Sequence, residues 1–198
     1  MSKVDEELPK PFKFELPYQL LMVEEGLELI QVSLEHKNEL FTLIDINRNY
    51  LRQWLPWLDD IRSVKDVEKQ ISTSIDEYLN GQGISYSMKL NDKIIGNITL
   101  NWIDYNNRSC GIGYWISEKF MGHGFITKCC SRLMQHCFND LDMHRFVLEV
   151  ATGNTPSISV AKRLGMRLEG CNIDREWLYD HFVDSNMYAI THPEFNYQ

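Results

Sequence analysis

Several signatures that would assign this chain to a class of protein are missing from its 198 residues. No run of about 18 apolar residues occurs, so we expect no membrane-spanning helix. The acidic, proline-containing first residues lack the apolar stretch of a signal peptide, and the six histidines show no H-E-x-x-H or comparable metal-binding spacing. We therefore expect a cytoplasmic protein that uses neither a metal ion nor a membrane.

Basic residues are fewer than acidic ones. The chain has 20 Lys and Arg residues and 28 Asp and Glu residues, which gives a net charge of -8. A nucleic-acid-binding surface needs an excess of basic residues, so we do not expect nucleic acid as a partner. An acidic surface instead attracts cationic partners. The five cysteines are odd in number and include no C-x-x-C motif. We interpret them as small buried apolar residues of a reduced protein rather than as a redox site.

The composition that is present, 43% hydrophobic and 12% aromatic, supports one full core and therefore a single domain over residues 1–198. Residues 1–17 hold three prolines among charges and are expected to form a loose arm. We expect a mixed α/β fold whose sheet has about seven strands and is flanked by about four helices. The expected strands are 27–33, 84–90, 94–103, 110–116, 145–151, 169–178 and 182–190, and the expected helices are 34–50, 64–79, 125–137 and 156–164.

The stretch from Cys110 to Arg132 has the order strand, glycine turn, helix. Residues 111–116 are apolar and aromatic, Gly122-His123-Gly124 follows, and apolar residues then recur with helical spacing from Ile126. A helix start leaves unpaired N–H groups at the positive end of the helix dipole. Glycines lack a Cβ, so a phosphate can approach their backbone closely. The stretch therefore predicts an anion-binding turn.

Two common phosphate motifs do not fit this turn. The Rossmann pattern would need a third glycine where Ile116 stands, and the P-loop would need lysine where Phe125 follows the second glycine. One remaining interpretation is a G-x-G pyrophosphate turn, with Lys119 three positions before Gly122. The other is a tight turn whose small residues only allow close packing of strand and helix.

A second stretch, Asn154 to Gly170, reads N-T-P-S-I-S-V-A-K-R-L-G-M-R-L-E-G. We predict a helix with Thr155 as N-cap, Pro156 at its first position and Gly165 just past its end. This stretch, the G-x-G turn and the segment G-Y-W-I before it resemble the GCN5-related N-acetyltransferase (GNAT) superfamily, in its RimL/RimJ-like ribosomal-protein-serine branch. The resemblance runs from about residue 29 to residue 190. Lys119 departs from it, because the pyrophosphate motif of the family has Gln or Arg there.

The resemblance implies the fold of that superfamily, a twisted sheet splayed open between the strand that ends near Ile116 and the strand that starts at Arg145. It also implies acetyl-coenzyme A as cosubstrate. The turn would hold the pyrophosphate, with a hydroxyl from Thr127 and a charge from Lys128, while Asn154 would bond the pantetheine arm. His123 would face solvent and contribute only its backbone. The residues expected at the cofactor are Trp115, Ile116, Met121, Gly122, His123, Gly124, Phe125, Ile126, Thr127, Asn154 and Ser157.

No nucleophile elbow or Cys-His arrangement is visible, which favours direct attack of an amine on the thioester over an acyl-enzyme. The resemblance implies that Ser157 protonates the leaving thiolate and that Glu176 accepts the proton of the amine, through a water where needed. A backbone N–H near Ile116 would polarise the carbonyl. Ser157 could instead be an ordinary first-turn helix residue, and Glu176 a solvated strand carboxylate. Glu149 and Asp184 are the reserve carboxylates.

The segment from Leu51 to Asp60 combines Trp54, Trp57, a proline and two acids. It could be an apolar cap over the core, a wall of the acceptor pocket or part of a homodimer interface. The leading acceptor is the N-terminal amine of a protein, and the runner-up is a small amine such as a polyamine or an aminoglycoside. The alternative of a different class is a coenzyme A-binding protein that does not turn over.

Overall fold

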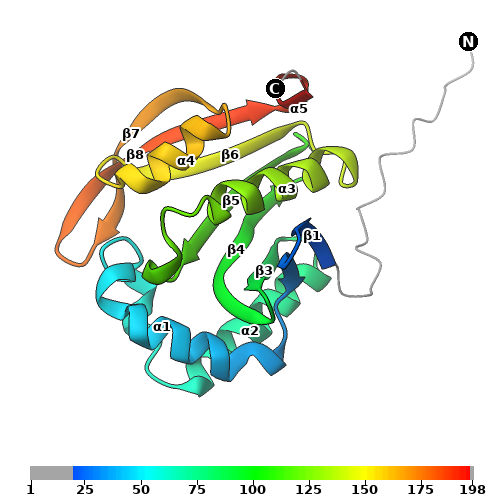
Figure 1. Cartoon of the computed structure of the whole chain (residues 1–198). Coiled ribbons are helices and arrows are strands. Elements are labelled where there is room, and N and C mark those ends of the chain that lie inside the picture. The colour runs from blue at the N-terminus through cyan, green and yellow to red at the C-terminus, as the bar shows by residue number, and fades with distance from the viewer. Residues whose placement is uncertain (1–19, 197–198) are drawn as a thin grey trace, which may run out of the picture.

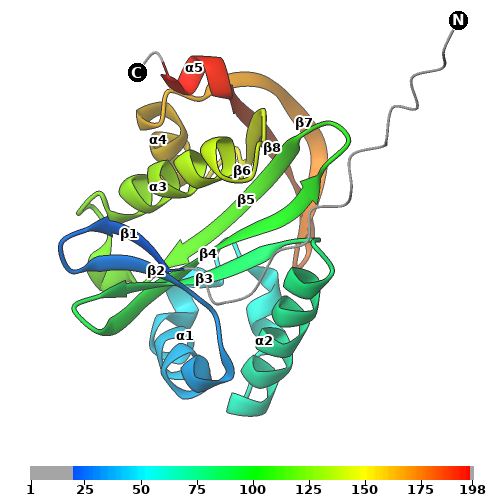
Figure 2. The same cartoon turned by 90° about the vertical axis from the view of Figure 1, so that its right-hand side faces the viewer.

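The strands form one open, twisted sheet that separates two layers of helices (Figures 1 and 2). The computed structural model describes residues 20–196, so the arm expected at residues 1–17 lies outside the described residues. The strand order across the sheet is β1-β2-β3-β4-β5-β6-β8-β7. The strands are β1 (Leu20–Glu24), β2 (Leu27–Gln31), β3 (Ile84–Leu90), β4 (Lys93–Asp104), β5 (Ser109–Ile116), β6 (Arg145–Ala151), β7 (Arg167–Leu178) and β8 (His181–Thr191).

The helices cover both faces of this sheet. Two of them, α1 (Lys37–Leu51) and α2 (Val64–Leu79), lie on one face, while α3 (Phe125–Asn139) and α4 (Thr155–Arg163) lie on the other (Figure 2). A short α5 (His192–Asn196) follows β8. The mixed α/β architecture is as predicted, and β1 and α5 are the elements that the sequence analysis did not predict. No helix within residues 20–196 is both long enough and apolar enough to cross a membrane.

The first five strands form antiparallel neighbours joined in chain order. The predicted turn between β3 and β4 is confirmed. Asn91 and Asp92 both have positive φ, 46° and 65°, which a type I′ turn requires and which these two residue types tolerate. The hairpin aligns the alternate residues of β4 with those of β3, so the polar side chains of both strands meet on one face.

The sheet opens between β5 and β6. These strands run parallel and pair only over Ser109–Ile112 of β5, while β6 continues its pairing with β8 as far as Ala151. From Gly113 to Ile116, β5 keeps its partner β4 but has no strand on its other edge. The predicted splay is therefore confirmed, and it leaves backbone groups of β5 facing a gap rather than a strand.

The helix α3 packs on the sheet through an apolar stripe. Ile126, Cys129, Cys130, Leu133 and Cys137 are all buried, as their helical spacing predicts. Burial raises the pKa of the Cys129 thiol to about 12, so this thiol stays protonated.

The expectation that all five cysteines are buried is wrong for Cys171, which is exposed. It lies on β7, the outermost strand of the sheet, where one side of the strand has no neighbour to cover it.

Candidate active site

A cleft of about 670 Å³ lies at the splay between β5 and β6. Every residue that the sequence predicts at the cofactor lines this cleft, although the residues come from the end of β5, the turn before α3 and the start of α4. The structure thus brings both sequence motifs to one place. The lining residues that were predicted are Trp115, Ile116, Met121, Gly122, His123, Gly124, Phe125, Ile126, Thr127, Asn154 and Ser157.

The glycine turn gives this cleft an open anion-binding end. A short 3-10 helix, η3 (Glu118–Phe120), leads into the turn, where Gly122 and Gly124 have φ of 75° and 80°. A Cβ added at either glycine would meet no atom within 4 Å, so the space above the turn is open. Gly124 is the N-cap of the 15-residue α3, whose first N–H groups have no intrahelical partner.

Thr127 supplies a further unsatisfied donor in the first turn of α3. Its Oγ1 is buried and has no hydrogen-bond partner within the described residues. A buried hydroxyl without a partner is costly, and a ligand oxygen in the cleft would satisfy it. The open glycines, the helix start and this hydroxyl therefore fit a pyrophosphate group.

The side chain of His123 also takes part in shaping the turn. Its Nδ1 lies 2.8 Å from the carbonyl oxygen of Met121 and donates to it, and its ring stacks on Phe125 with 5.7 Å between ring centroids. The residue is exposed, as expected, but the side chain is held rather than free in solvent. It therefore stiffens the loop whose backbone faces the cleft.

The two lysines near the turn contribute less charge than the sequence suggests. Lys128 lines the cleft, but its Nζ lies 2.7 Å from Glu24 of β1, which balances its charge. Lys119 does not line the cleft, and its Nζ lies 5.6 Å from the ring centroid of Phe120. The backbone of the turn is therefore the principal anion-binding element.

The start of α4 corrects one prediction. The helix begins at Thr155 with Asn154, not Thr155, as its N-cap. The Asn154 side chain accepts a hydrogen bond through Oδ1 from the backbone N–H of Ser157, at 3.3 Å. The amide side chain reaches the third helical N–H, so the hydroxyl one residue later is not needed. The cap engages Oδ1, and Nδ2 has no partner among the described residues.

Tyr114 lies in the cleft beside Ser157 and was not predicted. Burial raises the pKa of the Tyr114 phenol and the nearby Ser157 side chain opposes that rise, while the Tyr114 hydroxyl makes no hydrogen bond within the described residues. The residue belongs to the G-Y-W-I segment, so the motif pointed at the correct strand but not at this side chain. Ser157 therefore has a phenol, as well as the helix start, next to its hydroxyl.

Glu176 lies outside this cleft. It pairs with Val183 across β7 and β8 and shares a strand face with Leu178, and both of these neighbours line a second cavity of about 640 Å³. Trp54 lines both the cleft and the second cavity. Ser157 thus lines the cleft, whereas Glu176 lines neither space. Only its strand neighbours reach the second cavity, which shares Trp54 with the cleft.

The electrostatic environment of Glu176 suits a base. Burial raises its pKa, the charge of Glu149 adds to the rise, and Arg175 opposes it. Its carboxylate makes no ion pair or hydrogen bond within residues 20–196. The reserve carboxylates are engaged, because Glu149 pairs with Arg175 at 3.0 Å and Asp184 accepts from a backbone N–H at 2.9 Å.

The segment after α1 serves two of the roles proposed for it, a cap over the core and a wall of cavities. It contains a 3-10 helix, η2 (Pro56–Asp60), in which Leu58 is fully buried and caps the core. Trp54 and Trp57 instead line cavities. Leu51 and Leu55 of this segment also line the cleft. Sequence analysis missed Tyr50, near the end of α1, and Arg163, at the end of α4, since nothing in a helical pattern shows which turn faces a cleft.

Comparison with known proteins agrees with this geometry. Residues 27–167 match the acetyltransferase (GNAT) domain family. The chain is 33% identical over 171 residues to a ribosomal-protein-serine acetyltransferase of Escherichia coli, covering 86% of this chain and 96% of that protein.

Solved structures give the same result. A RimL ribosomal L7/L12 alpha-N-protein acetyltransferase in complex with coenzyme A is similar with a TM-score of 0.85 and 30% identity, covering 87% of this chain and 98% of that one. The microcin C7 self-immunity acetyltransferase MccE, in complex with acetyl-CoA and AMP, is similar with a TM-score of 0.82 and 28% identity, covering 85% and 94%. The chain therefore belongs to the GNAT acetyltransferase family and is an acetyl-CoA-dependent N-acetyltransferase.

Proposed function

We propose that the acceptor of the acetyl group is the α-amine at the N-terminus of a protein, of the ribosomal-protein type. The observation that carries this proposal is the 33% identity to a ribosomal-protein-serine acetyltransferase over 96% of that protein. The similar coenzyme A complex is also of an enzyme that acts on a protein α-amine. The acidic net charge of -8 favours approach of a protonated amine over that of an anionic substrate.

The residues around the cleft support a direct transfer. Acetyl-CoA supplies an activated thioester that reacts with an amine. Backbone N–H groups of Gly122, Gly124 and the first turn of α3 would bind its pyrophosphate, with the Thr127 hydroxyl as a further donor. Nδ2 of Asn154 would donate to the pantetheine arm.

Proton transfer is assigned to Glu176 and Ser157. Glu176 would accept the proton that the amine loses, through a water that bridges the second cavity and the cleft. A backbone N–H at the free edge of β5 near Ile116 would stabilise the oxyanion. Ser157 would donate a proton to the leaving thiolate.

The cellular location and the oligomeric state remain predictions. We place the reaction in the cytoplasm, which is supported by five cysteines without a disulfide. The homodimer expected from the resemblance is testable by size-exclusion chromatography with light scattering.

A thiol-release assay tests the acceptor. Acetyl-CoA would be offered with Ser-starting peptides, spermidine and an aminoglycoside at equal concentrations. We expect turnover with the peptides at least tenfold above that with either small amine. Turnover with a small amine alone would contradict the proposal and assign the enzyme to metabolite or drug acetylation.

A further inference from the structure

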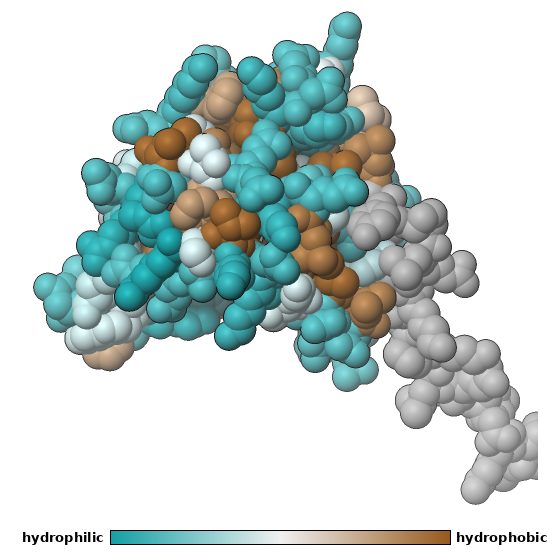
Figure 3. Space-filling model, turned by 90° about the horizontal axis from the view of Figure 1, so that it is seen from below, coloured by the Kyte–Doolittle hydropathy of each residue, from teal (hydrophilic) through white to brown (hydrophobic). Residues whose placement is uncertain are grey.

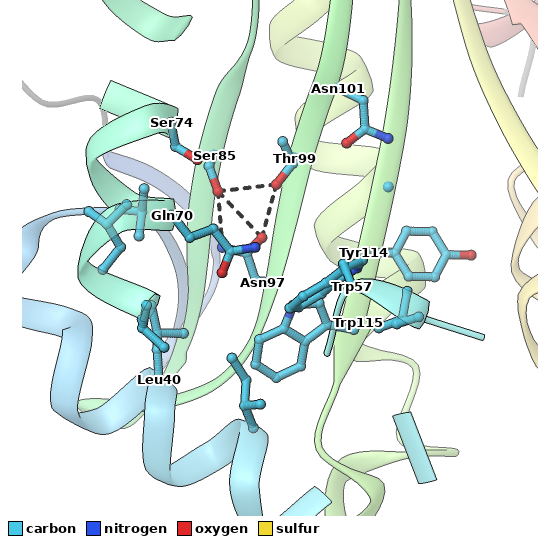
Figure 4. A pocket seen from close by; sticks show the side chains of 16 residues that line it. Leu40, Trp57, Gln70, Ser74, Ser85, Asn97, Thr99, Asn101, Tyr114 and Trp115 are labelled. Carbon is cyan, nitrogen blue, oxygen red and sulfur yellow. Dashed lines mark hydrogen bonds between the residues drawn. The ribbon is translucent and has the colours of Figure 1, made fainter. Parts of the chain in front are cut away.

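A third cavity, of about 270 Å³, lies on the other face of the splayed strand (Figure 4). It is enclosed by α1, α2, the segment with Trp57 and the strands β3 to β5. Leu55, Tyr114 and Trp115 line both this cavity and the cofactor cleft. A group seated in the cavity would therefore lie next to the point where β5 meets the proposed reaction site.

Neutral hydrogen-bonding side chains form the inner wall of this cavity. Asn97, Thr99 and Asn101 alternate along β4 and so share one face, and Ser85 of β3 stands opposite Thr99. Ser85 Oγ lies 3.1 Å from Thr99 Oγ1, Asn97 Nδ2 donates to Ser85 Oγ at 3.1 Å, and Thr99 Oγ1 donates to Asn97 Oδ1 at 2.9 Å (Figure 4). Gln70 of α2 adds a further amide.

The wall opposite the polar cluster is aromatic. Trp57 and Trp115 line the cavity, while the Tyr114 ring points away from it in Figure 4. Gly113 allows this arrangement, because a Cβ there would come within 2.8 Å of the Asn101 amide.

Among residues 20–196, the lining includes no Asp, Glu, Lys, Arg or His. A cationic group entering the cavity would lose its hydration without meeting an opposite charge, which is unfavourable. An uncharged hydroxyl or amide would find several donors and acceptors. The volume is several times the roughly 30 Å³ of one water molecule, so a small side chain and part of its backbone fit.

We infer that this cavity selects the acceptor by its first side chain and takes a small uncharged hydrogen-bonding group, such as the hydroxymethyl of serine. The inference rests on the proposed function, because the group in the cavity would be the side chain on the carbon that bears the α-amine. The amine and that side chain leave the same carbon, so their two sites must adjoin, as the shared wall of Leu55, Tyr114 and Trp115 provides.

The test compares peptides that differ only in their first residue, Ser, Ala or Lys, and measures kcat/KM by thiol release. Thr99→Val removes a hydroxyl from the cavity with little change of shape and suits a strand. Gln70→Glu places a carboxylate on the exposed surface of α2 at the edge of the cavity. Thr73→Val is the matched control, because the Thr73 hydroxyl is exposed on α2 and donates to a carbonyl oxygen of its own helix.

We expect wild type and Thr73→Val to prefer Ser over Ala by about tenfold, and Thr99→Val to lose most of that preference. Gln70→Glu should raise the Lys-to-Ser ratio by about threefold, as an exposed ion pair allows. Binding of acetyl-CoA, measured by calorimetry, should stay unchanged in all three variants.

Two kinds of result would overturn the inference, and they differ. Turnover of Ser peptides with a Ser-to-Ala ratio that Thr99→Val leaves unchanged would remove the cavity as the selecting site and keep the proposed function. A wild-type enzyme that prefers the Lys-starting peptide would also remove the cavity as the selecting site and keep the proposed function. No turnover of any peptide, with spermidine accepted, would overturn the proposed function and the inference together.

Discussion

Glu176 illustrates how much of the proposed chemistry depends on the surroundings of a single side chain. As a free strand carboxylate it would be a weak base at neutral pH. Burial and the charge of Glu149 raise its pKa above the ordinary 4.5, against the effect of Arg175. A base is most effective when its pKa approaches the working pH, so the shift is in the useful direction.

The Glu176→Gln variant tests this role. A base acts in its deprotonated form, so wild-type kcat/KM should rise with pH through a limb set by the raised pKa of Glu176. Glu176→Gln should lose that limb and lower kcat by about 10²- to 10⁴-fold, with the Kd for acetyl-CoA unchanged. Glu149→Gln is the control and should keep the limb but move it to lower pH, because the charge of Glu149 helps to raise the pKa of Glu176 and pairs with Arg175, which lowers it. A wild-type pH profile in Glu176→Gln would remove this residue as base.

At the scale of the element, the turn before α3 and the end of α1 decide how the cofactor cleft is held. The turn could be predicted from sequence, because glycine spacing and helical periodicity are local signals. The contact that fixes it could not, because it comes from residues about 70 positions apart. Asn47 of α1 accepts hydrogen bonds through Oδ1 from the Glu118 N–H at 2.9 Å and the Ser117 hydroxyl at 3.2 Å.

Gly124→Glu is expected to abolish binding of acetyl-CoA. The change puts a carboxylate into the open space above the turn, opposes an anion there and strains a residue whose φ is 80°. Gly170→Ala is the matched control, because a Cβ at this exposed glycine also meets no atom within 4 Å but lies far from the turn in sequence. Calorimetric titration with coenzyme A, with circular dichroism to verify folding, measures the difference. Undiminished binding in Gly124→Glu would refute the pyrophosphate assignment.

Asn47→Ala should weaken the support of the turn rather than the chemistry. Asn47 is 5% exposed, and its loss leaves the buried Ser117 hydroxyl and the part-buried Glu118 N–H without their acceptor. We expect the free energy of unfolding to fall by about 1 to 3 kcal/mol and the KM for acetyl-CoA to rise more than kcat falls. Ile46→Ala, at a neighbouring position that is 72% exposed, serves as control. Equal effects of the two changes would argue against this role for Asn47.

Sequence signals differed in strength between elements. The α3 and α4 helices carry periodicity and glycine or proline boundaries, and both were predicted. The strand β1 was not, although an apolar run before Glu25-Gly26 is a hairpin signal, since Gly26 supplies the positive φ of 76°. The N-cap of α4 was misplaced by one residue, because Asn and Thr are both good caps and only the geometry decides between them.

At the scale of the molecule, charged side chains near the C-terminal end tie β6, β7 and α5 together. Glu169 of β7 pairs with Arg145 of β6 and with Arg167, and Arg167 also pairs with Glu194 of α5. Hydrogen bonds from Arg145 and then Arg167 lower the pKa of Glu169 to about 2. The opposite face, seen from below in Figure 3, shows apolar side chains interrupted by hydrophilic ones.

This network predicts a loss of stability in acid. A carboxyl whose folded pKa lies below its unfolded value stabilises the fold above the unfolded pKa, and the contribution fades as pH falls toward the folded pKa. For Glu169 that window runs from about 4.5 down to about 2. The difference in urea midpoint between wild type and Glu169→Gln should therefore be larger at pH 7 than at pH 3. A difference that does not change with pH would exclude this ion-pair network as its source.

The fold and the cofactor cleft could be predicted from sequence because the two motifs are local and each carries its own turn or cap. The acceptor side could not. Its inner wall combines β4 residues that read as ordinary strand positions with Ser85 and Gln70 from other elements, and only the register of β3 and β4 brings them together. Likewise, no local signal shows that Trp54 lines both the cleft that holds Ser157 and the second cavity beside it.

The most direct test of the central claim is to locate the acetyl group on a product. A peptide that begins with Ser and carries an internal Lys would be incubated with the enzyme and acetyl-CoA, and tandem mass spectrometry would place the added acetyl. We predict acetylation of the α-amine alone, with the Lys side chain unmodified. Acetyl on the Lys side chain, or an unmodified peptide alongside acetylated spermidine in the same mixture, would contradict the account.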